Sequence, residues 1–134
     1  MSGAAIARQL LIARAGLTAL VPATRIIAGV IPQATVLPCI GITEVVSTDR
    51  MTLKGAAFIK VYETVQITVL AANYPACKAA MAQARKACRD FVGSVGTYAA
   101  ITSHLGSKGP DFQTDTGICA QTQDIKITFN EAAT

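Results

Sequence analysis

The sequence of 134 residues contains no tryptophan, and aromatic residues make up only 5% of it. Base-stacking platforms need aromatic side chains interleaved with basic ones, and no such pattern occurs here. The core must therefore be built from alanine, valine and isoleucine, which bury little area each at roughly 25 cal/mol per Å². Both a stable monomer and a modestly stable subunit that gains burial by oligomerisation fit this composition.

Charged residues are also few, at 15%, against 51% hydrophobic residues. This balance is typical of a globular chain with disorder confined to loops and ends. The length suits one hydrophobic core, so we expect a single domain over residues 1–134. The net charge of +4 is not gathered into a run, and it is weak support for a nucleic-acid-binding module.

Long apolar stretches are missing, since none approaches the ~20 residues that span a bilayer. The N-terminus lacks the basic region and apolar run of a signal peptide. We therefore expect no membrane partner and a chain made and kept in a cytoplasm.

Groups for catalysis are sparse. The only histidine, His104, has no acid or nucleophile placed beside it by the sequence, so we expect a structural or surface role for it. None of the four cysteines forms a C-x-x-C pair, and we expect all four to be buried, reduced thiols: Cys39, Cys77, Cys88 and Cys119. Residues 93–96 are glycine-rich but follow an expected helix, the wrong context for a phosphate loop. The sequence predicts no enzyme, no cofactor and no metal site.

The clearest pattern is a strand that leads directly into a helix, within residues 58–92. Apolar residues alternate along one strand face at Ile59, Val61, Val65, Ile67 and Val69. Glu63 interrupts that face. It is either a buried, paired carboxylate or the point where the strand leaves the core, and we favour the second because unpaired burial is costly.

The helix is predicted by a cap and by helical spacing. Asn73 suits an N-cap, and Pro75 is tolerated in the first turn. Apolar residues then recur at helical spacing: Cys77, Met81, Ala84, Cys88 and Phe91. This stripe has a natural partner in the apolar face of the preceding strand.

The other elements are weaker. We expect a helix over 4–21 with a split at Gly16, because glycine weakens a helix interior. Extended segments are expected at 25–31, Cys39–Val46 (with Ile40, Ile42 and Val46 on one face), Tyr98–Leu105 and Ile118–Phe129, with a flexible tail at 130–134. This order predicts an α+β fold, with a mostly antiparallel sheet of about four to five strands and two helices packed on one face.

Two polar connections, 47–57 and 106–116, are longer than a hairpin turn of about two to five residues requires. The first mixes the apolar Met51 and Leu53 with charged residues, a combination suited to an interface, although a purely solvated loop remains open. The expected assembly interface comprises Asp49, Arg50, Met51, Leu53, Lys54, Lys108, Asp111 and Phe112.

Several segments occur in an order that resembles a known family. The end of a helix at 17–21 is followed by an Arg-Ile-rich strand and a Pro-Gln loop at 24–33 and by a Leu-Pro pair that opens the next strand at 37–40. A strand at 64–69 leads into an alanine-rich, basic helix. A closing loop and strand occupy 111–127. Together they resemble the tail terminator family of long-tailed bacteriophages, also called tail completion or tail-to-head joining proteins.

This resemblance implies a structural virion protein. Such a protein forms a homo-oligomeric ring, typically a hexamer, on the head-proximal end of the tail tube. The ring stops tube growth and offers the docking surface for the head connector, and genomic DNA passes through it without sequence-specific binding. A head-side neck or connector protein and, less favoured, a small nucleic-acid-binding module are the alternatives.

Overall fold

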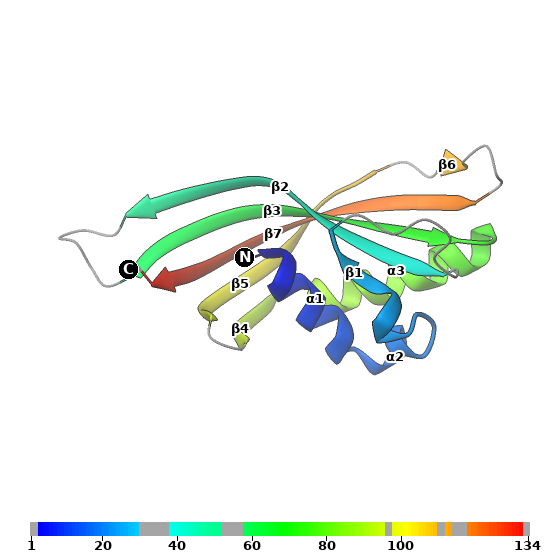
Figure 1. The fold of residues 1–134 in the computed structure, drawn as a ribbon, viewed down its shortest axis with the longest axis horizontal. Coiled ribbons are helices and arrows are strands. Elements are labelled where there is room, and N and C mark those ends of the chain that lie inside the picture. The colour runs from blue at the N-terminus through cyan, green and yellow to red at the C-terminus, as the bar shows by residue number, and fades with distance from the viewer. Residues whose placement is uncertain are drawn as a thin grey trace.

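The computed structural model describes residues 3–29, 38–51, 58–95, 98–109, 112–113 and 118–132. Its elements, shown in Figure 1, are α1 (Gly3–Ala13), α2 (Ala15–Thr18), the 3-10 helix η1 (Ala23–Arg25), β1 (Ile26–Ala28), β2 (Cys39–Met51), β3 (Phe58–Ala71), α3 (Tyr74–Cys88), β4 (Phe91–Val95), β5 (Tyr98–Lys108), β6 (Phe112–Gln113) and β7 (Cys119–Ala132).

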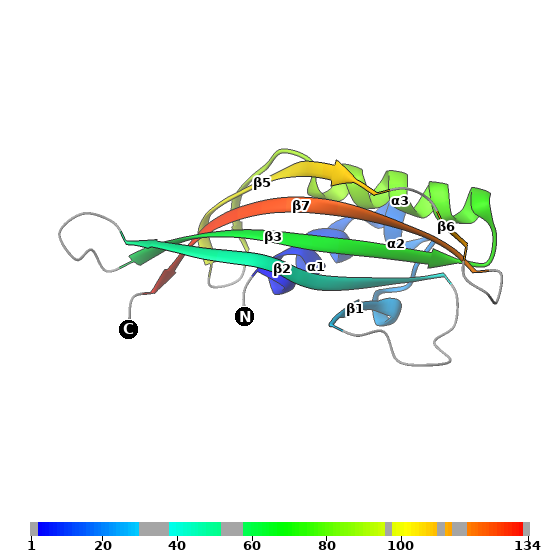
Figure 2. The same cartoon turned by 90° about the horizontal axis from the view of Figure 1, so that it is seen from above.

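One curved sheet organises the described residues. Its strand order is β1-β2-β3-β7-β5-β4, and the short β6 pairs with β7 beside this path, which makes seven strands (Figure 2). β1 runs parallel to β2, whereas the other pairs are antiparallel. The expected α+β class is therefore supported, but the expected count of four to five strands was too low and the sheet is mixed.

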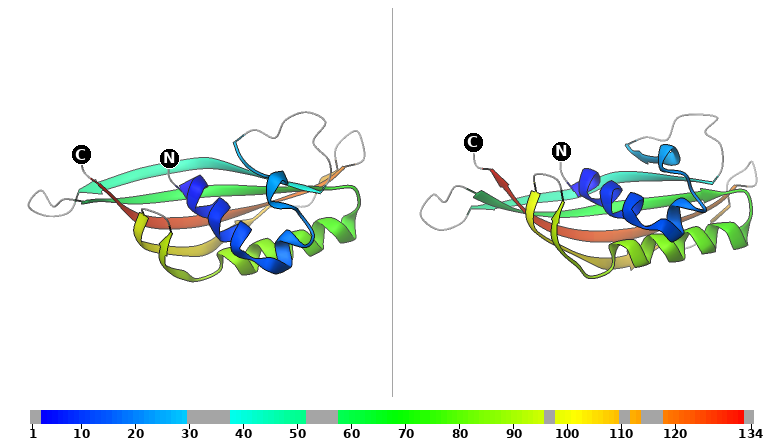
Figure 3. Two further views of the ribbon diagram at one scale, coloured as in Figure 1. Left: turned by 60° about the horizontal axis from the view of Figure 1, so that its bottom comes forward. Right: turned by 90° about the horizontal axis from the view of Figure 1, so that it is seen from below.

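The helices lie on one face of this sheet, with α1 over β2 and β3 and α3 over β3, β7 and β5 (Figure 3). The alternation along β3 explains this: Val61, Glu63, Val65, Ile67 and Val69 are buried on the covered face, while Tyr62, Thr64, Gln66 and Thr68 on the other face are exposed or half-buried. The other fully buried large side chains include Ile6, Leu11 and Leu17 from α1 and α2, Met81 from α3, and Ile125, Ile127 and Phe129 from β7.

α3 begins as expected. The Asn73 side chain accepts a hydrogen bond from the Ala76 N–H at 2.9 Å, and Pro75 lies in the first turn. The helix ends at Cys88, earlier than the expected end near Val92, because Asp90 adopts φ 50° and turns the chain. Phe91 and Gly93 therefore belong to β4 and not to a helix or a helix stop.

The first helix is split, as the sequence suggested, but at a different residue. Arg14 has an extended conformation (φ −86°, ψ 105°), and Gly16 lies inside α2. The Arg14 Nε donates to Gln83 Oε1 on α3 at 3.1 Å, so a hydrogen bond at the break links the first helical segment to α3.

β2 is longer than predicted and contains an irregularity. Its register against β3 shifts between Glu44 and Val46, so Val46 does not continue the alternation of Ile40 and Ile42 that the sequence analysis assumed. Beyond the shift the strand continues to Met51, although residues 47–51 were expected to be loop. Polar residues are compatible with a strand here because, among the described residues, this section of β2 pairs with β3 and lies at an edge of the sheet.

The C-terminal strand is also longer than expected. β7 continues through Ala132, whose backbone partner is Phe58, so the tail predicted for 130–134 is strand up to that residue. β5 likewise extends to Lys108 and shortens the second expected loop.

Candidate assembly surfaces

The structure divides the expected interface residues into two groups at opposite ends of the sheet. Met51 pairs with Ile59 at the start of β3, whereas Phe112 pairs with Ala120, which lies opposite Leu70 at the other end of β3. Figures 1 and 2 show these ends far apart along the strands. At about 3.3 Å per strand residue, β3 alone separates them by roughly 40 Å. The two groups therefore cannot form one continuous site within a subunit.

The first group closes the β2–β3 ladder. Asp49, Arg50 and Met51 are the last residues of β2, and their backbone partners are Val61, Lys60 and Ile59. Leu53 and Lys54 lie outside the described residues. The second group ends β5 and forms β6: Lys108 pairs with Gln123 and Phe112 with Ala120, while Asp111 lies outside the described residues.

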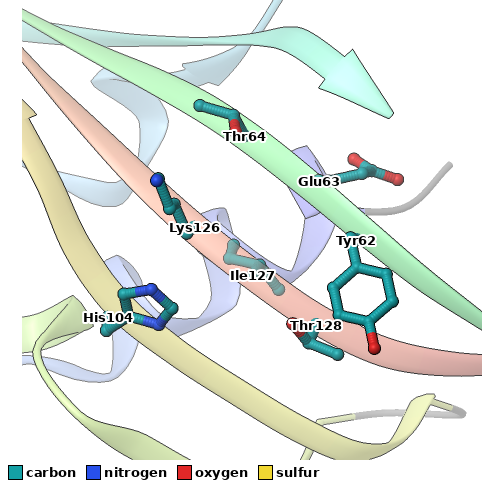
Figure 4. A pocket seen from close by; sticks show the side chains of 7 residues that line it. All are labelled: Tyr62, Glu63, Thr64, His104, Lys126, Ile127 and Thr128. Carbon is teal, nitrogen blue, oxygen red and sulfur yellow. The ribbon is translucent and has the colours of Figure 1, made fainter. Parts of the chain in front are cut away.

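A third surface, which the sequence did not reveal, lies on the face of the sheet that the helices leave open. A depression of about 280 Å³ is lined there by Tyr62, Glu63, Thr64, His104, Lys126, Ile127 and Thr128 (Figure 4). His104 and Lys126 are backbone partners on β5 and β7, and Thr64 faces Lys126 from β3. The alternation of side chains along each single strand could be inferred from the sequence. The register between the three strands, which places these residues side by side, could not.

The side chains that line this depression suit a contact surface and not a catalytic site. His104 is exposed, in agreement with the expected surface role. The carboxylate in the wall, Glu63, is only 4% exposed and accepts a hydrogen bond from the Gly3 N–H at 2.9 Å on the opposite, helix-covered face. Figure 4 shows Glu63 and His104 well apart, on different strands. The described residues thus supply no acid–base pair here.

Glu63 also corrects a prediction. The strand does not leave the core at this position, because Val61 and Val65 on either side of it are buried. Burial is tolerated because the carboxylate receives an N–H from the first turn of α1, where backbone donors have no partner in the helix and the helix dipole favours an anion.

Three of the four thiols are buried, as expected, and Cys119 is not. Cys39, Cys77 and Cys88 are buried and Cys119 is half-buried, and all four are free. Burial raises the pKa of the Cys88 thiol to about 12, and burial also raises the pKa of Cys39 against the opposing effect of Arg25. A protonated, buried thiol is a poor nucleophile and a poor metal ligand. Over the described ranges, no group of three or more histidine, cysteine, aspartate or glutamate side chains is placed to hold a metal ion.

No helix in the part of the chain that the structure describes is long and apolar enough to cross a membrane.

Comparison with known proteins gives two findings. The family model of the tail completion protein gp17 matches residues 5–127. Among solved structures, a chain of the virion of a native gene transfer agent particle has a similar fold, with a TM-score of 0.65 and 18% sequence identity over 96% of this chain and 94% of that one. No curated protein matches in sequence.

Proposed function

This chain belongs to the tail completion protein gp17 family, and we propose that it caps the head-proximal end of a phage tail tube as a ring. The family assigns it a structural role in a phage tail. The observation that carries the proposal is the match over residues 5–127, which covers all described helices and strands except the first two residues of α1 and the last five of β7. A fold shared with a chain of a phage-like virion is consistent with this role.

In this proposal the ring is a homohexamer that ends tail growth and forms the docking surface for the head connector. Its partners are further copies of this chain, the tail tube protein and the connector, while genomic DNA passes through without sequence-specific binding. The ring belongs to the neck of the virion and is assembled in the host cytoplasm. No chemical step is required of it, which agrees with a family of structural virion proteins.

The separation of the two interface groups supports a ring that has two working faces. A cap must contact the tube on one side and the connector on the other. Residues 49–51 lie at one end of the sheet and Phe112 at the other. We infer that one group meets the tube and the other meets the connector.

Electron microscopy of particles from cells that lack this chain tests the proposal. We expect overlong tails, or completed heads and tails that fail to join, and restoration by the wild-type chain supplied in trans. Tails of normal length with unfilled or leaking heads would instead indicate a head-side connector. Normal particles without the chain would overturn both roles.

A further inference from the structure

Two strands of the sheet have one side without a neighbouring strand in the described residues. β1 accompanies β2 only as far as Ile42, where Gly29 N–H donates to the Ile42 carbonyl at 2.7 Å. From Thr43 to Met51, β2 is paired with β3 alone. At the other end of the strand order, β4 pairs only with β5. We call these the β2 edge (Thr43–Met51) and the β4 edge (Phe91–Val95).

Each edge also carries an exposed apolar side chain. Val45 on the β2 edge is 54% exposed, and Val92 on the β4 edge is 77% exposed. Free edges present unpaired backbone N–H and C=O groups and are normally covered or protected by charge. An exposed valine beside free backbone groups favours pairing with another strand.

In the described residues, each of these two strands has one register shift against its partner strand. The register shifts between Glu44 and Val46 in β2, and between Gly93 and Val95 in β4, where Gly93 has φ 156°. Such bulges restrict which strand can pair. Beyond its bulge, β2 runs from Val46 to Met51 in unbroken register with β3. This section is one residue longer than β4, which has 5 residues, and it has the usual strand length of about 5–6.

We propose that neighbouring copies join by strand addition, with the β4 edge of one copy pairing with the β2 edge of the next. This inference rests on the proposed ring and specifies the contact that builds it. The two edges lie on opposite sides of the sheet, because β1 covers β2 only up to Ile42, so each copy uses both edges, once each, in a head-to-tail contact. Head-to-tail contacts close into a ring when the rotation between neighbouring copies completes a full turn, and a closed ring leaves neither edge free. A different protein bound at one edge would leave the other unpaired, which is why a second copy is the better occupant.

Lysine substitutions test the edges. Val45→Lys and Val92→Lys place a charge at positions that are already exposed, so the subunit should fold with an unchanged melting temperature, while a charge opposes edge pairing. Leu20→Lys is the matched control, because Leu20 is 43% exposed but follows α2, away from both edges. We expect each edge variant to reduce the amount of this chain in purified tails at least tenfold and the control to leave it unchanged. Wild-type incorporation of both edge variants would overturn the inference.

Cross-linking identifies the partner. Tails that contain the double variant Val45→Cys and Val92→Cys should give, with a short bismaleimide, a ladder at multiples of the chain's mass, whereas either single variant should not. A product with a protein of another mass, or no ladder from tails in which micrographs show the ring, would refute strand addition between copies. Those outcomes leave the capping role intact. Normal particles in the complete absence of the chain would refute the capping role itself.

Discussion

The two faces of the sheet contribute differently to folding and to assembly. On β3, Val61, Glu63, Val65, Ile67 and Val69 are buried against the helices, whereas Tyr62 between them is 41% exposed. The neighbouring strands continue the contrast, with Phe129 buried and Lys126 exposed on β7. Burial on the covered face supplies the free energy of folding. Substitutions that impair folding should therefore concentrate on that face, and substitutions that impair assembly should concentrate on the open face, the edges and the sheet ends.

The largest effect is expected from Phe129→Ala. Phe129 is fully buried on the covered face, so its truncation should lower the free energy of unfolding by about 3–5 kcal/mol. The adjacent Thr128→Ala, on the open face, should change it by about 0.5 kcal/mol or less. Urea denaturation of the two variants measures the contrast. Equal losses would mean that the two faces do not divide stability in this way.

The next effect concerns the polar group on the covered face. Glu63→Ala removes the acceptor of the Gly3 N–H and should cost about 1–3 kcal/mol, because a buried donor loses its partner. Glu63→Gln keeps a side-chain oxygen and should cost less. Gly3→Ala should also destabilise, since a Cβ at residue 3 would lie 2.5 Å from Glu63 Oε1. A Glu63→Ala variant as stable as the wild type would show that the contact with α1 is unimportant.

A smaller effect is expected from pH. Burial raises the pKa of the Cys88 thiol from 9.0 to about 12, so the folded state favours the protonated thiol. The stability from this group is complete below pH 9.0 and is lost as the pH rises toward 12. Wild-type protein should therefore lose about 1.4 kcal/mol more per pH unit in this window than Cys88→Ala does. Chemical denaturation of both proteins below and above pH 9.0 tests this. If stability falls with pH in parallel for the wild type and Cys88→Ala, the folded protein accommodates the Cys88 thiolate.

The covered face was also the part that the sequence predicted best. The cap at Asn73, the alternation of β3 and the helical spacing of Cys77, Met81, Ala84 and Cys88 all reflect burial of one side, which leaves a periodic pattern. The α+β class followed from these elements. Glu63 was misjudged because its partner, Gly3, is distant in sequence and the contact depends on how α1 docks.

The edges and ends were predicted poorly. Phe91 was assigned to the helix because it continues the helical spacing of Cys88, and only the turn at Asp90 separates the helix from β4. The polar residues 47–51 were interpreted as loop, although an edge strand needs no alternating apolar face. The depression around His104 and Lys126 depends on register between strands, which a single sequence does not encode in any local pattern.

The smallest effect on stability, and a large one on assembly, is expected at the end of the β2–β3 ladder. The ladder is in register up to the Met51–Ile59 pair, so the connection 52–57 can be replaced by Asn-Gly, which with Phe58 makes a three-residue turn and keeps every described β2–β3 pair. We expect the free energy of unfolding to change by about 0.5 kcal/mol or less, as for substitutions outside the core. Joining of heads to tails should nevertheless fail, because Leu53 and Lys54 belong to the proposed interface. A control that keeps the length but replaces only these two residues by Gly and Ser separates the effect of length from that of side chains. Fully infectious particles from the shortened variant would show that this connection is only a spacer, and that the contacts of the ring lie elsewhere on the open face or the edges.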